Sequence, residues 1–418
     1  MAGGMWTPAY AGVTFRPRAV ATIVVIPAKH VLRERAGTGI HPPTATTTSI
    51  PSYNAPGMRL EEFDYPLPSE LIAQRPLEER DASRLMVLDR AAGMFEDRTF
   101  RELPRLLHTG DLLVFNNTKV FPARLLGHRR GTAAQPIGKH NPAAREHLTG
   151  EVELMLTRQV GENDWEGLVH PGRKIRTGEV LIFGDGELEA EVLGRGEYGI
   201  RRVRLRAREG SIDAAIDRLG HVPLPPYIHR PDESSDRETY QTVYAKVRGA
   251  VAAPTAGFHF TERVLAELRK RGVESCEVTL HVGLGTFQPV RAANVEEHQM
   301  EGERYEISEA AATAINRALD DHRRIVAVGT TSVRTLEHVA REHDGRIAAG
   351  RGETSLFITP GFQFGIIGAL LTNFHLPKST LLMLVSAFAG REVTLRAYAH
   401  AISERYRFYS YGDCMLIV

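Results

Sequence analysis

An uncharged segment, residues 249–260, surrounds a single titratable side chain. It reads Gly-Ala-Val-Ala-Ala-Pro-Thr-Ala-Gly-Phe-His-Phe, so that His259 lies between Phe258 and Phe260. An imidazole titrates close to neutral pH and can transfer protons, while small and aromatic neighbours suit a flat, weakly charged ligand such as a nucleobase. We expect Thr255 and Phe258 to contact that ligand. A buried turn around a core histidine is the alternative interpretation.

A second candidate site is the hydroxyl-rich turn Gly329-Thr330-Thr331-Ser332, which lies between an apolar run and a predicted helix. Free backbone N–H groups at a helix N-terminus attract anions. Arg334, in the first turn of that helix, could complete a clamp for a carboxylate or phosphate. The alternative is an ordinary helix cap followed by a surface arginine.

Two more histidines lie near the ends of predicted strands. His281 is at the end of the predicted strand 277–282, and His375 belongs to the loop Asn373-Phe-His-Leu-Pro377. Because α/β proteins bind ligands beyond the carboxyl ends of their strands, we take His259, His281 and His375 as candidate catalytic residues and Asn373 as a candidate substrate contact. Packing in the core is the alternative for His375.

An arginine-rich stretch, residues 201–208, has the alternation of a β-strand. It places Arg202, Arg204, Arg206 and Arg208 on one face and apolar side chains on the other. Such a row is a candidate track for the phosphates of an RNA, which Arg173, Lys174 and Arg176 could extend. A solvated barrel face is the alternative.

The pattern of predicted elements indicates an α/β fold with two domains. Short strands separated by Gly-containing turns, at 151–157, 165–169, 180–183, 187–193 and 199–206, predict a small barrel or sandwich. After Pro223, alternating strands and helices predict a mainly parallel sheet covered by helices. We therefore expect a small β-barrel-like domain at residues 112–219, inserted into a mainly parallel α/β catalytic domain formed by residues 58–111 and 220–418, with a short helix at 68–74.

Composition excludes several classes of protein. The chain has 418 residues, 42% hydrophobic and 25% charged, with only two cysteines, which is typical of a globular protein without a disulfide framework. No apolar run approaches the ~20 residues of a membrane helix, and we expect a cytoplasmic protein without a metal site. Residues 1–57 carry a net +4 and the remainder −3, so any RNA-binding surface must be a local patch. We interpret residues 1–57 as a disordered extension or a mis-assigned start.

The ordered set of motifs from Met58 onward resembles the S-adenosylmethionine:tRNA ribosyltransferase-isomerase family of queuosine synthesis. Leu284 and Phe258 depart from its usual pattern, where smaller or aliphatic residues are commoner, and we interpret both as conservative packing changes. The matching segments are Phe63–Pro68, Asn116–Leu125, Gly220–Tyr227, Gly249–Phe260, His281–Val290, Val328–Glu337, Thr359–Phe364, Leu371–Gly390 and Tyr406–Asp413.

The resemblance implies a reaction. The ribosyl group of S-adenosylmethionine would be transferred and isomerised onto 7-aminomethyl-7-deazaguanine at the wobble position of tRNA, giving epoxyqueuosine-tRNA, adenine and methionine. S-adenosylmethionine would be the co-substrate, no further cofactor would be needed, and the enzyme is expected to be monomeric.

Two other functions are compatible with the residues themselves. The arginine row would also suit a tRNA-binding protein without catalytic activity, and the α/β pattern would suit an unrelated small-molecule transferase or hydrolase. A tRNA-binding protein without catalytic activity would not release adenine from S-adenosylmethionine. An unrelated transferase or hydrolase would turn over its substrate without tRNA.

We predict that residues 58–418, purified alone, fold and act as the full chain does. Residues 1–57 lack sustained periodicity and precede the first matching motif. Circular dichroism melting and adenine release measured on both proteins test this, and loss of folding or turnover on truncation would contradict it.

Overall fold

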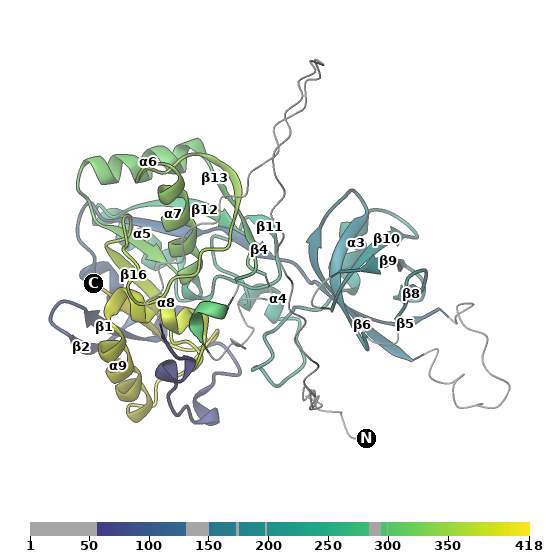
Figure 1. Ribbon diagram of the computed structural model, residues 1–418, viewed down its shortest axis with the longest axis horizontal. Helices are drawn as coiled ribbons and strands as arrows, with labels where there is room; N and C mark the ends of the chain where they lie inside the picture. Colours follow the sequence, from purple (N-terminus) through teal and green to yellow (C-terminus); the bar gives the residue numbers. More distant parts are fainter. Residues whose placement is uncertain (1–56, 131–149, 173–174, 197–198, 284–293, 299) are drawn as a thin grey trace, which may run out of the picture. The chain divides into compact units, whose positions relative to one another are not determined.

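The computed structural model describes residues 57–130, 150–172, 175–196, 199–283, 294–298 and 300–418. These residues form a large sheet covered by helices and a closed β-barrel (Figure 1). The expectations for residues 1–56, for Arg173 and Lys174, and for most of the segment 281–290 lie outside the described residues.

The large sheet has nine strands and a mixed direction. Four neighbouring pairs run parallel, namely β12–β3, β3–β14, β14–β16 and β17–β1, and four run antiparallel. The α/β class is confirmed, but parallel pairing dominates only in the centre of the sheet. In spatial order the strands are β15 (Gly350–Thr354), β13 (Glu303–Ile307), β12 (Glu274–Leu280), β3 (Leu112–Asn116), β14 (Ile325–Val328), β16 (Ala369–Asn373), β17 (Cys414–Ile417), β1 (Arg84–Asp89) and β2 (Met94–Thr99).

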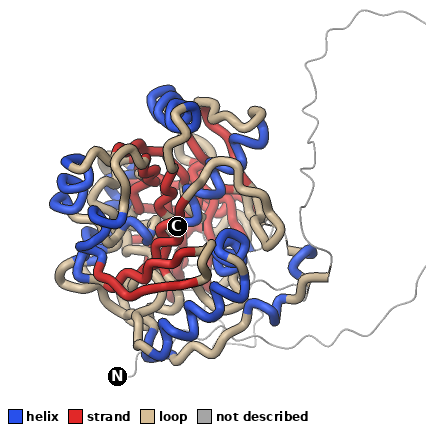
Figure 2. Tube along the Cα trace, turned by 90° about the vertical axis from the view of Figure 1, so that its left-hand side faces the viewer, coloured by secondary structure: helices blue, strands red, loops and turns tan. Residues whose placement is uncertain are grey.

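Both faces of this sheet are buried, because alternate residues of each central strand enter different cores. In β3, Leu112 and Val114 belong to one apolar cluster, while Leu113 and Phe115 belong to another. The first cluster includes residues of helices α6 (Glu309–Asp320), α7 (Thr330–Glu342), α8 (Thr380–Ala389) and α9 (Arg391–Ser403). The second includes residues of α1 (Leu103–Leu106) and α5 (Glu262–Lys270). Figure 2 shows the strands between these helices.

Local signals set several helix starts correctly. The Thr261 hydroxyl accepts a hydrogen bond from Val264 N at 3.2 Å and begins α5, and Ser308 does the same for α6. The helix expected at 68–74 is wrong, since only Ser69–Leu71 form a 3-10 turn, η2. The helix does not continue because the next residue, Ile72, forms a β-bridge with Phe408.

The second body is a closed barrel of six antiparallel strands, as expected from the short strands. Helix α3 (Ile212–Leu219) packs Ala215 and Ile216 into the barrel core. Closure leaves no unpaired sheet edge. The order around the barrel is β10 (Ile200–Ala207), β7 (Asp164–His170), β6 (Glu151–Gln159), β5 (Arg124–Arg129), β8 (Val180–Phe183) and β9 (Leu188–Arg195).

The chain leaves the large sheet later than residue 112. β3 is a central strand of that sheet, and β4 (Thr118–Val120) pairs with β11 (Val247–Ala250) outside the barrel. The barrel begins only at Arg124, which forms an antiparallel bridge with His221 where the chain returns. The apolar run 112–116 reads as a buried strand from sequence, but its pairing partner depends on residues 274–278 and 325–327.

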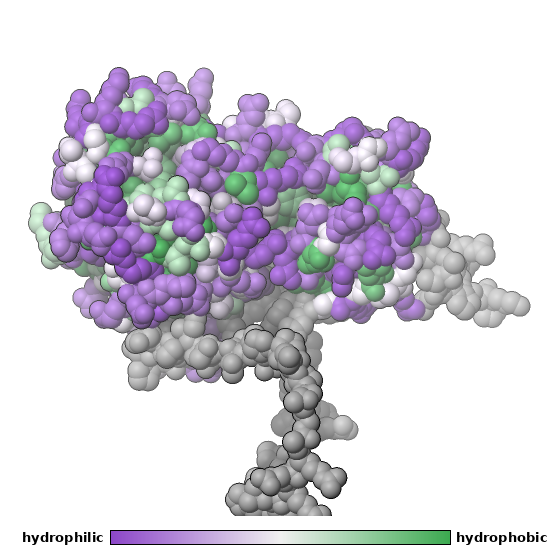
Figure 3. All heavy atoms as spheres, turned by 90° about the horizontal axis from the view of Figure 1, so that it is seen from above, coloured by the Kyte–Doolittle hydropathy of each residue, from purple (hydrophilic) through white to green (hydrophobic). Residues whose placement is uncertain are grey.

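Hydrophilic side chains dominate the face drawn in Figure 3, where apolar side chains form small patches. Within the described parts of the chain, no helix is both long and apolar enough to cross a membrane.

Candidate functional site

The main pocket lies at the carboxyl ends of the adjacent parallel strands β14 and β16, where ligands of α/β proteins bind. Its enclosed volume is about 70 Å³, so any ligand larger than a few water molecules must extend out of it. The lining comes from Tyr227, from 253–256, from Val282, from 329–331, from 372–376, from Ser379 and Leu381, and from Tyr409 and Ser410.

The described lining residues include no aspartate, glutamate, lysine or arginine, but they include many hydroxyl groups. One of these, Thr331 Oγ1, is buried and has no hydrogen-bond partner among the described residues. An unpartnered buried hydroxyl is costly, and a ligand that reaches it would remove that cost.

The positive end of α7 faces the same pocket. Gly329 precedes the helix with a φ of 88°, which favours glycine, and the first helical bond runs from Val333 N to Gly329 O at 3.4 Å. The N–H groups of Thr330 and Thr331 therefore have no partner within the helix. Such N–H groups and the helix dipole are the features that attract an anion to a helix N-terminus.

The side chain of Asn373, at the end of β16, joins the walls of the pocket. Its Nδ2 donates to Tyr409 O at 3.0 Å and to His259 Nε2 at 3.4 Å. Its Oδ1 accepts from the Thr255 hydroxyl at 3.4 Å. Asn373 and Thr255 thus line the pocket together.

His259 lies behind Asn373 and does not line the pocket. Because its Nε2 accepts from Asn373, its Nδ1 carries the proton and donates to Ser83 Oγ at 2.7 Å. Ser83 Oγ in turn donates to Arg80 O at 3.2 Å. Burial, followed by the charges of Arg407 and Arg80, lowers the pKa of His259 to about 3. The ring is therefore neutral at physiological pH, and its geometry is that of a group that orients Asn373.

His375 is the one of the three candidate histidines that lines the pocket. Its Nε2 shares a hydrogen bond with Thr372 Oγ1 at 2.8 Å. Its backbone is fixed by two tyrosines, since His375 N donates to Tyr398 Oη at 3.0 Å and its carbonyl accepts from Tyr65 Oη. Burial lowers the pKa of His375 to about 3, so its imidazole is neutral at physiological pH.

His281 lies away from the pocket, beside β4 and β11. Its Nδ1 is 2.9 Å from Thr118 Oγ1, and a Cβ on Gly249 would come within 2.6 Å of its ring. Burial and the nearby Arg304 lower its pKa. The small residue at 249 thus admits the His281 ring, and the structure does not bring His281 together with His375.

Phe258 does not line the pocket either, although its sequence neighbours suggested a stacking surface. Its ring packs against Tyr240 and Tyr411, with centroids 5.5 and 5.9 Å away, in an apolar cluster that includes Val120. The Phe258 side chain thus points into the core. The residue pattern alone does not define which side of a loop is buried.

Arg334 is a buried ion-pair partner instead of part of an anion clamp. It is 3% exposed and pairs with Glu303 of β13, while burial lowers its pKa to about 10. Helix α7 is buried on all sides, so a charged side chain within it requires a partner. The guanidinium is not among the groups that line the pocket.

Tyr227, Tyr409 and Ser410 are among the lining residues that were not singled out in the sequence. They lie in motifs 220–227 and 406–413, and two tyrosines within such motifs are the signal that could have found them. A hydrogen bond holds the backbone of Tyr227 in place. Gln74 Nε2 donates to Tyr227 O at 2.9 Å.

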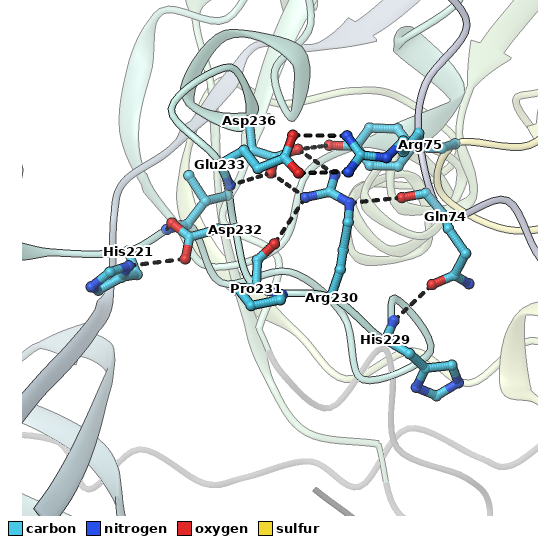
Figure 4. Close-up of polar contacts among 11 residues, drawn as sticks. Gln74, Arg75, His221, His229, Arg230, Pro231, Asp232, Glu233 and Asp236 are labelled. Carbon is cyan, nitrogen blue, oxygen red and sulfur yellow. Dashed lines mark hydrogen bonds and ion pairs between the residues drawn. The ribbon is translucent and has the colours of Figure 1, made fainter. Parts of the chain in front are cut away.

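A polar network fixes the loop that follows Tyr227. Arg230 binds both carboxylate oxygens of the buried Asp236, at 2.6 and 2.8 Å, and Tyr411 Oη donates to Asp236 Oδ1 at 2.9 Å (Figure 4). Burial raises the pKa of Asp236, but the hydrogen bonds from Arg230, Glu233 N and Tyr411 outweigh it and lower the pKa below its usual value. This carboxylate stays ionised and connects the loop to the C-terminal segment.

The arginine row has the predicted orientation on the barrel. Arg202, Arg204 and Arg206 point outward from β10, while Val203 and Leu205 are buried. Each outward arginine is ion-paired: Arg202 and Arg204 with Asp164, at 2.9 and 2.8 Å, and Arg206 with Glu191, at 3.1 Å.

The acidic partners of the row come from β7 and β9, which flank β10, so they neutralise part of the positive charge of the row. Arg208 follows the strand and is exposed, and it forms no ion pair with the described residues. Phosphates that bind the row would have to compete with Asp164 and Glu191.

Comparisons with known proteins agree on one family. A family profile described as queuosine biosynthesis protein matches residues 60–417. The S-adenosylmethionine:tRNA ribosyltransferase-isomerases of Solibacter usitatus and Moorella thermoacetica are each 55% identical, over 363 and 361 residues, which is 86% of this chain and 100% of each relative. A crystal structure of S-adenosylmethionine tRNA ribosyltransferase from Thermotoga maritima is 38% identical and covers 85% of this chain and 100% of its own, with a TM-score of 0.47.

The low pKa of His259 predicts a loss of stability in mild acid. The unfolded chain binds a proton at this histidine below pH ~6.5, whereas the native state does not until about pH 3. Stability should therefore fall with decreasing pH by about 1.4 kcal/mol per unit in this window. Denaturant unfolding at pH 7 and 5 should show wild type losing about 2 kcal/mol more than His259→Gln. Parallel pH dependences of the two proteins would contradict the buried neutral state.

Proposed function

The chain belongs to the queuosine biosynthesis protein family, whose relatives are S-adenosylmethionine:tRNA ribosyltransferase-isomerases, and we propose that it catalyses their reaction in full. The ribosyl moiety of S-adenosylmethionine is transferred and isomerised onto 7-aminomethyl-7-deazaguanine in tRNA. Epoxyqueuosine-tRNA, adenine and methionine are the products. The observation that best supports this assignment is the neutral, hydroxyl-lined pocket at the start of α7.

The pocket offers a place for the methionine carboxylate of S-adenosylmethionine. The free N–H groups of Thr330 and Thr331 and the unpartnered Thr331 Oγ1 are donors for a carboxylate. Uncharged donors and acceptors of Asn373 and Thr255 suit the hydroxyls of a ribose or the edge of an adenine. We therefore propose that the nucleoside binds toward the β16 side of the pocket.

The chemistry requires a proton to be moved at least twice. The sulfonium acidifies the C5′ hydrogens of the ribose, so that a base can form an ylide. Adenine then leaves with a proton, the substrate amine attacks, and closure of the epoxide expels neutral methionine. Among the three candidate histidines, His375 is assigned this proton exchange because it lines the pocket. His259 is assigned the orientation of Asn373.

The reaction itself provides the decisive experiment. The full chain is mixed with S-adenosylmethionine and tRNA that carries 7-aminomethyl-7-deazaguanine, and adenine release is followed by chromatography. Release that depends on the tRNA is expected. Binding of tRNA without release would favour a non-catalytic binding protein, and release without tRNA would favour an unrelated transferase or hydrolase.

Replacement of His375 should reduce turnover much more than replacement of His259. We expect His375→Ala to lower kcat by about 10²–10⁴-fold, the usual contribution of a proton-transferring group, with little change in binding of S-adenosylmethionine. His259→Gln retains an acceptor for Asn373 and a donor for Ser83, so its kcat should fall less. His108→Ala, at an exposed histidine outside the pocket, is the control. A kcat of His375→Ala near wild type would refute the assignment.

The arginine row remains the proposed tRNA-binding surface, and its salt dependence tests this. Replacing Arg202, Arg204 and Arg206 by Gln should weaken tRNA binding and reduce the slope of log K against log salt by roughly one for each phosphate that is no longer neutralised. The matched control replaces Arg98, Arg317 and Arg346, which also bind carboxylates on the surface. If both triple variants keep the wild-type slope, the row is a solvated, ion-paired face.

A further inference from the structure

The pocket poses an electrostatic problem for the proposed substrate. S-adenosylmethionine carries a sulfonium cation, whereas the described lining residues include no carboxylate. His375, the titratable imidazole of the lining, offers no negative charge in either of its protonation states. A cation that leaves water without compensating interactions is strongly disfavoured. The faces of aromatic rings can supply such an interaction, because their quadrupole attracts cations.

Two tyrosines that line the pocket form an aromatic corner. The ring centroids of Tyr227 and Tyr409 are 4.6 Å apart and their planes are inclined by 51°. Burial raises the pKa of both phenols, so that each presents a neutral ring and not a phenolate. Any attraction of a cation to this corner therefore comes from the ring faces.

Tyr409 is held in an unusual backbone conformation. Its φ of 71° lies in the left-handed region, which non-glycine residues rarely adopt. Its N–H donates to Phe374 O at 3.2 Å, and its carbonyl accepts from Asn373 Nδ2 at 3.0 Å. Both partners line the pocket. Their hydrogen bonds thus hold Tyr409 in a backbone conformation of unfavourable energy beside the pocket.

Tyr227 is fixed at both ends. Its hydroxyl shares a hydrogen bond with Ser410 Oγ at 2.7 Å, and its carbonyl accepts from Gln74. The next residues are held by His229 N, which donates to Gln74 Oε1 at 2.7 Å, and by the Arg230–Asp236 pair (Figure 4). This network orders the ring before a ligand arrives, which reduces the entropy lost on binding.

We propose that Tyr227 and Tyr409 form a sulfonium-binding corner that distinguishes the charged substrate from neutral thioethers. The inference rests on the proposed function and adds the groups that recognise the reacting sulfur. The reaction converts the sulfonium into the thioether of methionine, so this attraction is lost when the carbon–sulfur bond breaks. Release of methionine is thereby favoured, while binding of S-adenosylmethionine is retained.

The test compares two ligands that differ at the sulfur, S-adenosylmethionine and S-adenosylhomocysteine. Calorimetry on the full chain gives the ratio of their dissociation constants. We expect Tyr227→Leu and Tyr409→Leu each to reduce the preference for the sulfonium by about 3- to 30-fold. Tyr227→Phe keeps an aromatic face and should keep the preference. Equal weakening of both ligands in the Leu variants would show that the rings serve packing alone and would overturn the inference.

A second series keeps the shape of the corner and protects the test against loss of folding. Phenylalanine with one, two or three fluorines at position 227 has a progressively weaker ring quadrupole. Stepwise loss of affinity for S-adenosylmethionine, with constant affinity for S-adenosylhomocysteine, is expected. Constant affinity for both ligands would overturn the inference. If wild type binds neither ligand, the proposed function fails instead, so that the two failures are distinguishable.

Discussion

The buried amide of Asn373 is the interaction on which the pocket depends. A primary amide needs partners at both ends when it is buried, and those of Asn373 come from two separate regions: the segment that holds Thr255 and His259, and Tyr409 of the C-terminal segment. Placing the amide at the end of β16 thus fixes the segment before α5 and the C-terminal segment against each other. The neutral state of His259 belongs to the same arrangement, because a protonated Nε2 could not accept from the amide.

The sequence predicted local features better than directions and partners. The short barrel strands agree with the structure, since each depends on a few neighbouring residues. The direction of β17 against β16 does not follow from periodicity, because it depends on how the chain returns to the sheet after α8 and α9. For the same reason residues 112–116 were assigned to the barrel domain, whereas β3 pairs with β12 and β14 in the large sheet.

For the site, too, the sequence predicted local residue patterns better than contacts between distant residues. Hydroxyl and amide residues after strands were expected near a ligand, and Thr255, Thr330, Thr331, Asn373 and His375 do meet in one pocket. Phe258 and Arg334 were expected at the same site but do not line the pocket. Sequence spacing does not define which neighbours bury a side chain. The sequence alone suggests that an arginine in the first turn of a helix is exposed. Helix α7 is buried on every side, so Arg334 requires an acidic partner, which is Glu303.

The bridge between Arg124 and His221 has a consequence for how the chain folds. Val247 lies 129 residues from Thr118, its partner across β4 and β11, and pairing over such a distance is slow because a long loop must close first. A barrel that has already closed holds Arg124 beside His221 and shortens the remaining loop to roughly 30 residues. Early closure of the barrel would therefore reduce the entropy lost when β4 pairs with β11, and assembly of the large sheet would be faster.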